Sequence, residues 1–295
     1  FKMVFCDGCA IGTVVYAVGL FTILSKLLPI AMEFLNKGKV SELVVKEYKK
    51  DVVYLVQFPG SKTYSSASPY CVKVEAFMRI NNIPFERVYA WFARGRNGKL
   101  PMIELNGEQI CDSQLIVRRL AEKFKVKNTL DPKTAGLVHA IDRFVDLQTF
   151  NLQVYYKSQC FDVILAECLP QNFPLFLVPI FTKFMGILVS FQIARTYLKA
   201  FGVFSDAEFN ELIRSDYTHL LNILGNQKYL FGEKPTLADC TAFGHLGAFY
   251  FAVPHDRIYP CSVLNEESFK PLREWLDRMK TEVFQGEFHK SEKQR

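Results

Sequence analysis

The order of strand and helix patterns between residues 52 and 124 constrains the fold more than any other feature of this chain. β-Branched and aromatic residues follow one another at Val52–Phe58, which predicts a buried strand. Ser68-Pro69 then predicts the start of a helix, because serine caps helix N-termini and proline suits the first helical position. A second strand is predicted at Ile83–Trp91. The first half of this segment therefore consists of a strand, a helix and a strand.

The second half of the segment contains two more strands and a helix. Short stretches at Met102–Leu105 and Gln109–Cys111 flank an Asn-Gly turn, which predicts a hairpin. Asp112 or Ser113 caps the helix that follows. The complete order is strand, helix, strand, then strand, strand, helix. We expect these elements to form one α+β domain.

Strand patterns disappear after about Asp131, and apolar residues then recur at helical spacing. Ser205 and Glu208 form a capping box at the start of one amphipathic helix. Thr236 and Asp239 form a second capping box, which opens a strongly apolar helix. We interpret Thr236 and Asp239 as residues that stabilise the fold and not as catalysts. The second part of the chain is therefore predicted to be all-helical.

Two stretches carry a resemblance to a known family. Residues 229–240, "YLFGEKPTLADC", closely resemble the signature of the all-helical second domain of glutathione transferases. Residues 57–86, which contain "SPYC" at Ser68–Cys71, are similar to the failed axon connections, cadmium-responsive and metaxin-related group. The resemblance implies an α+β thioredoxin-like N-terminal domain followed by an all-α glutathione-transferase C-terminal domain. An apolar run near the N-terminus predicts that these two domains are preceded by a hydrophobic helix.

This arrangement predicts four segments. Residues 1–50 form a hydrophobic N-terminal anchor and a basic linker, residues 51–128 the thioredoxin-like domain, residues 129–285 the all-helical domain, and residues 286–295 a polar tail. A homodimer is a further expectation from the resemblance, since glutathione transferases often pair through these two domains.

An apolar run near the N-terminus predicts a membrane anchor. Ile11–Met32 is 22 residues long and holds one charge, Lys26, and about 20 residues span a bilayer core. Lysines follow this run more densely than they precede it, so the positive-inside rule keeps the folded body in the cytosol. A monotopic or buried helix and a cleaved signal peptide are the alternatives. A second apolar stretch, Phe173–Ala194, is expected to be a buried or membrane-touching helix, with a second span as the alternative.

The resemblance also implies a glutathione site. Pro101 matches the proline that this fold holds in the cis form, which leaves the backbone of Leu100 free to bind a peptide. Asp112-Ser113 matches the acidic-serine pair at which glutathione transferases bind the γ-glutamyl end. A helix N-terminus presents unsatisfied N–H groups to a carboxylate, and the serine hydroxyl adds a donor. The Asp112 carboxylate is then expected to meet the ammonium group of glutathione.

Ser68 and Cys71 are the candidate catalytic residues. Glutaredoxin-like proteins carry C-P-Y-C at the start of a helix, and here Ser68 replaces the first cysteine while Cys71 retains the second. A hydroxyl donor and a helix N-terminus both favour a thiolate, so Ser68 is predicted to activate the sulfur of glutathione for attack on a small electrophilic substrate. Cys71 offers a rival mechanism if the helix lowers its pKa. Tyr64 and Tyr70 are alternative hydroxyl donors.

These expectations describe a membrane-associated glutathione transferase-like protein that acts in detoxification or stress response. The alternative is a non-catalytic membrane-associated adaptor, or an import or axon-development protein of the metaxin and failed axon connections type. The net charge of +6 is spread along the chain, which argues against nucleic-acid binding. Cys6 and Cys9 have no second close pair to complete a zinc site, so no metal is expected.

Overall fold

The computed structural model describes residues 42–60, 63–90, 93–127, 129–169, 175–188, 202, 204–251, 253 and 257–288. The predicted anchor at residues 11–32 and the pair Cys6 and Cys9 lie outside these ranges. Among the helices within them, none combines the length and apolar character that a membrane span requires. The same ranges contain no cluster of three or more histidine, cysteine, aspartate or glutamate side chains that could hold a metal ion.

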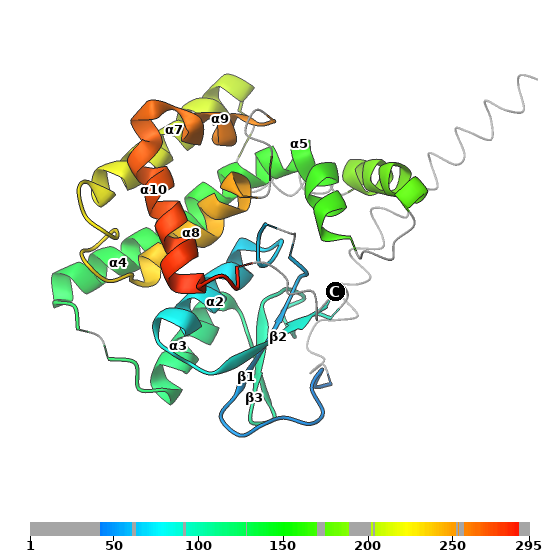
Figure 1. Cartoon of the computed structure of the whole chain (residues 1–295), viewed down its shortest axis with the longest axis vertical. Coiled ribbons are helices and arrows are strands. Elements are labelled where there is room, and N and C mark those ends of the chain that lie inside the picture. Colours follow the sequence, from blue (N-terminus) through cyan, green and yellow to red (C-terminus); the bar gives the residue numbers. More distant parts are fainter. Residues whose placement is uncertain are drawn as a thin grey trace, which may run out of the picture.

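A four-stranded sheet forms the first domain (Figure 1). Its strand order is β2-β1-β3-β4, and the strands are β1 at Val53–Gln57, β2 at Phe85–Tyr89, β3 at Met102–Leu105 and β4 at Glu108–Cys111. Strand β1 pairs parallel with β2 and antiparallel with β3, which pairs antiparallel with β4. Helix α2 (Pro69–Ile80) connects β1 to β2, and α3 (Ser113–Lys123) follows β4. The predicted order of elements is confirmed, and the domain is thioredoxin-like.

Strand β1 lies at the centre of the sheet because its side chains are buried on both faces. Val53 and Leu55 belong to the large core that also contains side chains of α2 and α3. Val56 packs on the opposite face with Leu100 and Met102. A strand that is covered on both faces reads as a continuous apolar run, and this is the pattern that identified it in the sequence.

The chain packs against the body at both ends of the described region. The carboxylate of Glu104 in β3 accepts hydrogen bonds from the backbone N–H groups of Val44 and Val45, at 2.8 and 2.9 Å. At the other end, Phe288 is 1% exposed, and its ring meets the Tyr64 ring edge-on. The end of the predicted linker and the start of the predicted polar tail are therefore parts of the folded body.

The regular elements described in the second domain are helices, apart from a β-bridge between Tyr229 and Gly232. Its elements are α4 (Pro132–Phe144), the π-helical turn η1 (Val145–Thr149), α5 (Phe150–Cys168), the 3-10 turn η2 (Leu175–Leu177), a helix at 178–188, α7 (Asp206–Leu224), α8 (Leu237–Tyr250), α9 (Tyr259–Asn265), η3 (Glu267–Phe269), α10 (Lys270–Arg278) and η4 (Met279–Val283). Helix α8 is buried along almost its whole length and packs on α2 of the first domain.

Three of the predicted helix starts can be compared with the structure. The capping boxes of Ser205 with Glu208 and of Thr236 with Asp239 are both formed. Ser68 is the residue that precedes α2, as predicted, but its side chain makes no capping hydrogen bond. The fixed backbone of Pro69 supplies the geometry of this helix start without the serine side chain.

Gly244 in α8 permits the close contact between the two domains. A Cβ atom at Gly244 would lie 2.5 Å from the backbone oxygen of Pro69, which is closer than real Cβ contacts come. The carbonyl of Gly244 also accepts a hydrogen bond from the Tyr64 hydroxyl. The absence of a side chain at this position therefore lets α8 rest directly on the first turn of α2.

We expect Gly244→Ala to lower the free energy of unfolding by about 1–3 kcal/mol, because the added methyl group forces the two helices apart. Gly136→Ala in α4 is the matched control, since a Cβ atom there meets nothing within 4 Å. Alanine stabilises an open helix interior by roughly 0.5–1 kcal/mol relative to glycine. Urea unfolding of both variants measures the difference, and two equally stable variants would contradict the packing argument.

Candidate functional site

A cavity of about 470 Å³ lies beside the start of β3 and the start of α3. Four of the six predicted site residues line it: Leu100, Pro101, Asp112 and Ser113. The peptide bond between Leu100 and Pro101 is cis, as the sequence predicts. The cavity volume falls within the range of roughly 300–1,000 Å³ that small-molecule sites occupy. Segments that are distant in the sequence therefore converge on one space of suitable size.

The start of α3 presents donors to this cavity. Asp112 caps the helix, and its Oδ1 atom accepts hydrogen bonds from the N–H groups of Gln114 and Leu115 at 3.0 and 3.2 Å. Its φ angle of 77° is uncommon for a residue other than glycine, and such backbone positions cluster at functional sites. The Ser113 hydroxyl makes no hydrogen bond with a described residue. One carboxylate oxygen of Asp112 is thus used in the cap. The Ser113 hydroxyl remains available as a hydrogen-bond donor at the cavity.

Three cationic side chains line the same cavity: Arg94 and Lys99 from the loop between β2 and β3, and Arg143 from α4. The Arg94 guanidinium lies 4.7 Å above the centre of the Phe58 ring. Burial lowers the pKa of Arg94, but arginine stays charged in proteins. Two carboxylates, those of Asp112 and Asp146, also line the cavity, so its wall carries charges of both signs.

Ser68 and Cys71 are not among the residues that line the cavity. Ser68 is 9% exposed and Cys71 is 0% exposed. Burial raises the pKa of Cys71 to about 11, although hydrogen bonds with Ser68, the Phe58 backbone and Ser66 oppose this rise. The condition for the rival mechanism, a pKa of Cys71 below its ordinary value, is therefore not met, because burial removes the hydration that a thiolate requires. A thiolate at Cys71 is not favoured near neutral pH.

Tyr70 is the aromatic hydroxyl that does line the cavity. Its hydroxyl donates to the backbone oxygen of Asp146 at 2.9 Å, and burial raises its pKa above the usual value for tyrosine. Tyr64 lies apart from the cavity, buried against α8, where its hydroxyl donates to Gly244. Of the two alternative donors, only Tyr70 is placed to meet a ligand.

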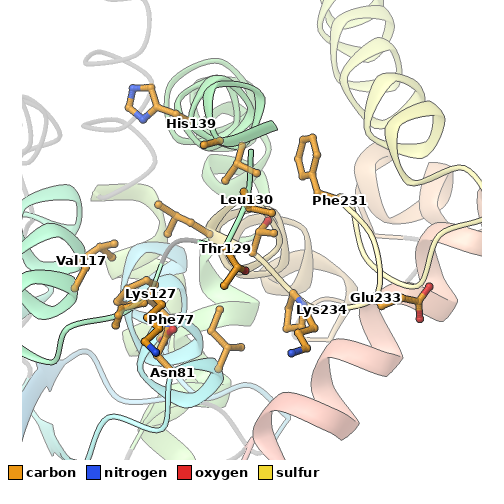
Figure 2. A pocket seen from close by; sticks show the side chains of 18 residues that line it. Phe77, Asn81, Val117, Lys127, Thr129, Leu130, His139, Phe231, Glu233 and Lys234 are labelled. Atoms are coloured by element: carbon orange, nitrogen blue, oxygen red, sulfur yellow. The ribbon is translucent and has the colours of Figure 1, made fainter. Parts of the chain in front are cut away.

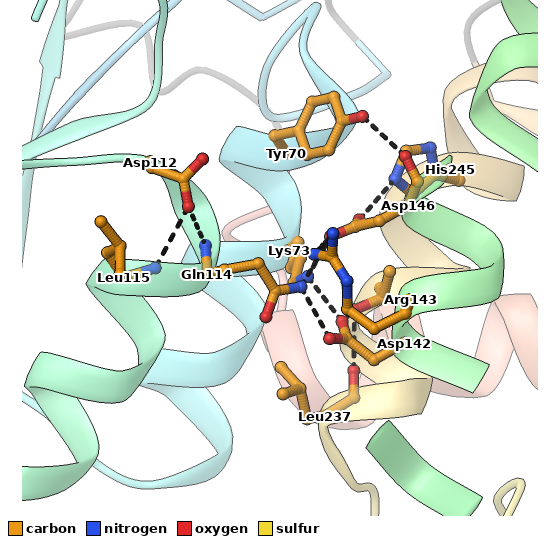
Figure 3. Close-up of polar contacts among 11 residues, drawn as sticks. Tyr70, Lys73, Asp112, Gln114, Leu115, Asp142, Arg143, Asp146, Leu237 and His245 are labelled. Carbon is orange, nitrogen blue, oxygen red and sulfur yellow. Dashed lines mark hydrogen bonds and ion pairs between the residues drawn. The ribbon is translucent and has the colours of Figure 1, made fainter. Parts of the chain in front are cut away.

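A buried cluster of charged side chains adjoins the cavity (Figure 3). The Nζ atom of Lys73 donates to Asp142 at 2.5 Å and to Asp146 at 2.6 Å, and the side chains of these three residues are at most 3% exposed. The Gln114 amide donates to the same two carboxylates at 2.6 and 2.8 Å. Lys73 and Gln114 come from α2 and α3, while Asp142 and Asp146 come from α4 and η1. The cluster therefore joins the two domains.

His245 in α8 completes the cluster. Its Nε2 atom lies 3.1 Å from Asp146 Oδ1. Burial lowers the pKa of His245. Burial alone would raise the pKa of Asp146, but the hydrogen bond from His245 and the charge of Lys73 outweigh it and lower this pKa. An ionised carboxylate only accepts, so Nε2 carries the proton of the neutral ring, and Nδ1 is buried without a hydrogen-bond partner among the described residues.

Sequence reasoning missed this cluster, although two signals for it are present. Lys73 is a lysine within the apolar start of a helix, and Asp142 and Asp146 are four residues apart. Residues with this spacing share one helix face. The partners from different domains, Gln114 and His245, carry no local signal. Through Gln114 and Asp146 the cluster also contributes to the cavity wall.

A second, larger cavity of about 860 Å³ lies between α2, α3, α4 and the loop before α8 (Figure 2). Its walls include Phe77, Val117, Leu130 and Phe231. None of the six predicted site residues lines it. The smaller cavity brings together the start of α3, a cis-proline loop and four of the predicted site residues, and it is therefore the candidate site.

Comparison with known proteins assigns the fold to a family. Residues 69–162 match the glutathione S-transferase N-terminal domain, and residues 213–279 match the glutathione S-transferase C-terminal domain. The chain belongs to the glutathione transferase-like superfamily. Both family domains occur in the expected order, and all residues that line the cavity of about 470 Å³ except Phe58 fall within the matched residues 69–162.

Individual relatives of this glutathione transferase-like protein agree with the assignment. Failed axon connections of Drosophila melanogaster is 29% identical over 249 residues, which cover 80% of this chain and 59% of that protein. The β-etherase LigF from Sphingobium sp. strain SYK-6 has a similar structure, with a TM-score of 0.54 and 19% identity over 79% of this chain and 98% of its own. A glutathione S-transferase of Ceriporiopsis subvermispora, in complex with glutathione, has a TM-score of 0.54 and 18% identity over 78% and 97%.

Proposed function

We propose that this glutathione transferase-like protein binds glutathione in the cavity of about 470 Å³. The observation that carries the proposal is the convergence of the Leu100-Pro101 loop, the start of α3 and three cationic side chains on one space. Glutathione has two carboxylates and one ammonium group, so a helix N-terminus and cationic walls suit it. A protein of the same fold that is in complex with glutathione supports the proposal.

Each part of the cavity has a proposed partner on the tripeptide. The Ser113 hydroxyl and the start of α3 receive the γ-glutamyl carboxylate, and the second oxygen of Asp112 faces the ammonium group. The backbone of Leu100 pairs with the central cysteine. Arg94, Lys99 and Arg143, which line the cavity, attract the carboxylates.

We further propose that the bound thiol loses its proton to solvent and that its sulfur forms a C–S bond with a small electrophile held against Leu147 and Phe150, two apolar residues of the cavity wall. The leaving group, a halide ion when the electrophile is an aryl halide, departs as the C–S bond forms. A free thiol has a pKa near ~8.5 and is mostly protonated at neutral pH, so it requires activation. Ser68 is the proposed activator because it lies at the start of α2, two residues before Tyr70 in the cavity wall. The helix N-terminus and a hydroxyl donor both favour the thiolate.

A non-catalytic membrane-associated adaptor is the second candidate. The position of Ser68 and Cys71 outside the cavity lining favours it, since no described thiol or serine hydroxyl other than that of Ser113 then meets the ligand. In both candidates, we propose that the apolar run Ile11–Met32 anchors the protein in a membrane with the body in the cytosol. The similarity to Failed axon connections is compatible with either candidate.

We expect Ser113→Ala to weaken glutathione binding by roughly 10–100-fold, because a hydrogen bond to a charged group contributes about 1.5–3 kcal/mol. Ser205→Ala is the matched control. Ser205 also lies at a helix start, where it forms the capping box of α7, but it does not line the cavity. Isothermal titration of the detergent-solubilised chain with glutathione measures both affinities. Equal losses in the two variants would indicate a general effect on folding, and no binding by the unaltered chain would refute the site.

The same preparations distinguish the two candidate functions, a glutathione-conjugating enzyme and a non-catalytic adaptor. The enzyme should conjugate glutathione to an aryl halide, and Ser68→Ala should abolish most of this turnover while glutathione binding persists. Cys71→Ser should leave turnover unchanged, because Cys71 is buried with a raised pKa. Binding without turnover in the unaltered chain would favour the adaptor.

A further inference from the structure

The helix at 178–188 and the turn before it expose large apolar side chains. Phe176, Ile180, Phe184 and Ile187 are 76%, 66%, 54% and 71% exposed. Ile180, Phe184 and Ile187 are four and three residues apart, so they lie on one helix face, and Phe176 precedes them by one further turn. We call these four residues the apolar stripe. Soluble proteins rarely expose contiguous apolar groups of this size unless the surface binds something.

The other face of this helix packs against the protein. Thr182 is 5% exposed, and a Cβ atom at Gly186 would lie 3.3 Å from the Cβ atom of Asp162 in α5. Small residues therefore bring the helix close to α5, and the apolar stripe faces outward. In Figure 1 the helix lies beside the end of α5 at the edge of the body, on the side away from α3. More than half of the surface of each of the four side chains in the apolar stripe is exposed.

We propose that the apolar stripe inserts into the surface of a lipid bilayer. Lys183 is the only charged residue between positions 178 and 188, and the segment contains no acidic residue. Lys183 is exposed and forms no ion pair with a described residue. An apolar face bordered by a lysine suits a membrane surface, because the apolar side chains enter the acyl boundary while the ammonium group reaches anionic headgroups.

The length of chain that connects the proposed anchor to the body supports this partner. The inference rests on the anchor named in the proposed function. Glu42, where the described region begins, lies ten positions after Met32, at the end of the apolar run. Ten residues span at most about 35 Å, whatever their conformation. The anchor therefore holds the body near the bilayer, and a tether of this length gives the apolar stripe a high effective concentration at the membrane surface.

A second copy of the chain suits the stripe less well. A two-fold contact through the same surface places identical patches against each other. It would therefore bring Lys183 of both copies into one apolar interface, with no acidic residue of this segment to pair with them. Lipid headgroups supply the negative charge that a second copy does not.

Tryptophan quenching by brominated lipids tests the inference. Full-length Phe184→Trp is reconstituted into vesicles of phosphatidylcholine and phosphatidylserine, with and without brominated acyl chains. The emission of Trp at position 184 is the difference between the variant and the unaltered chain, which contains Trp91 and Trp275. We expect brominated lipid to quench most of this difference. Leu115→Trp is the matched control: Leu115 is 48% exposed on α3, on the opposite side of the body, and its added emission should persist. Ile180→Glu and Ile187→Glu, combined with Phe184→Trp, should restore the emission.

Flotation of the same vesicles tests membrane anchoring by residues 11–32 independently of membrane insertion by the apolar stripe. A chain that floats with vesicles while position 184 escapes quenching would overturn the inference and leave the anchor intact. Cross-linking between copies through position 184, without quenching, would overturn it in favour of a dimer contact. A chain that does not float would overturn the anchor and this inference together. Flotation with selective quenching at position 184 would support both.

Discussion

Lys73→Met is expected to lower the free energy of unfolding by about 3–5 kcal/mol, because it leaves two buried carboxylates without their cation. Lys73 is fully buried and bonds Asp142 and Asp146. Lys49→Met is the matched control, since Lys49 pairs with Glu86 at 2.8 Å but both side chains are largely exposed. An exposed pair contributes only about 0–1 kcal/mol. Urea unfolding of both variants measures the contrast.

A second variant tests the cause of this loss. If uncompensated charge is responsible, Asp142→Asn in the Lys73→Met background should recover part of the stability, because one buried carboxylate is then removed. A double variant that is less stable than Lys73→Met alone would show that packing, and not charge, dominates at this site. A loss below 1 kcal/mol for Lys73→Met would contradict the role of the cluster in joining the domains.

Asp239→Ala is expected to lower the free energy of unfolding by about 3–5 kcal/mol, because it leaves several buried hydrogen-bond donors without an acceptor. Asp239 accepts hydrogen bonds from the N–H groups of Leu230 and Thr236, from the Thr236 hydroxyl and from Trp275 Nε1, at 2.8 to 3.1 Å. These contacts tie the start of α8 to the preceding loop and to α10. Thermal and urea unfolding measure the loss.

Asp131→Ala provides the matched control for this prediction. Asp131 also caps a helix, with hydrogen bonds from the N–H groups of Lys133 and Thr134, but it is exposed. Removing an ordinary cap costs roughly 0.5–2 kcal/mol. Asp239→Asn should fall between the two variants, since the amide keeps one acceptor. Equal losses for Asp239→Ala and Asp131→Ala would show that Asp239 acts as a simple cap and not as a junction.

Of these two stabilising centres, only the one at Asp239 was visible in the sequence. Asp239 belongs to a capping box, which is a local pattern, and its fold-stabilising role was predicted. Lys73, Asp142 and His245 meet only after α2, α4 and α8 have packed. No spacing along the chain indicates that Lys73 and Asp142, which are 69 residues apart, share a hydrogen bond.

The candidate site also contains some residues whose position the sequence predicted and others whose position it did not. Leu100, Pro101, Asp112 and Ser113 were predicted together, and they line one cavity because strand ends and a helix start are local features that the sheet brings to the same edge. Ser68 and Cys71 were predicted from a four-residue motif. That motif places them at a helix start but does not determine which way their side chains face.

The local patterns of the sequence determined the order of strands and helices, the helix starts and the family resemblance, since hydrophobic periodicity and capping depend on residues a few positions apart. Tertiary structure decided which side chains are removed from water. It buried Cys71 and raised its pKa, drew Lys73 into contact with two aspartates of the other domain, and left the apolar stripe at 176–187 exposed. These outcomes depend on contacts between distant segments, whose geometry arises only when the helices pack.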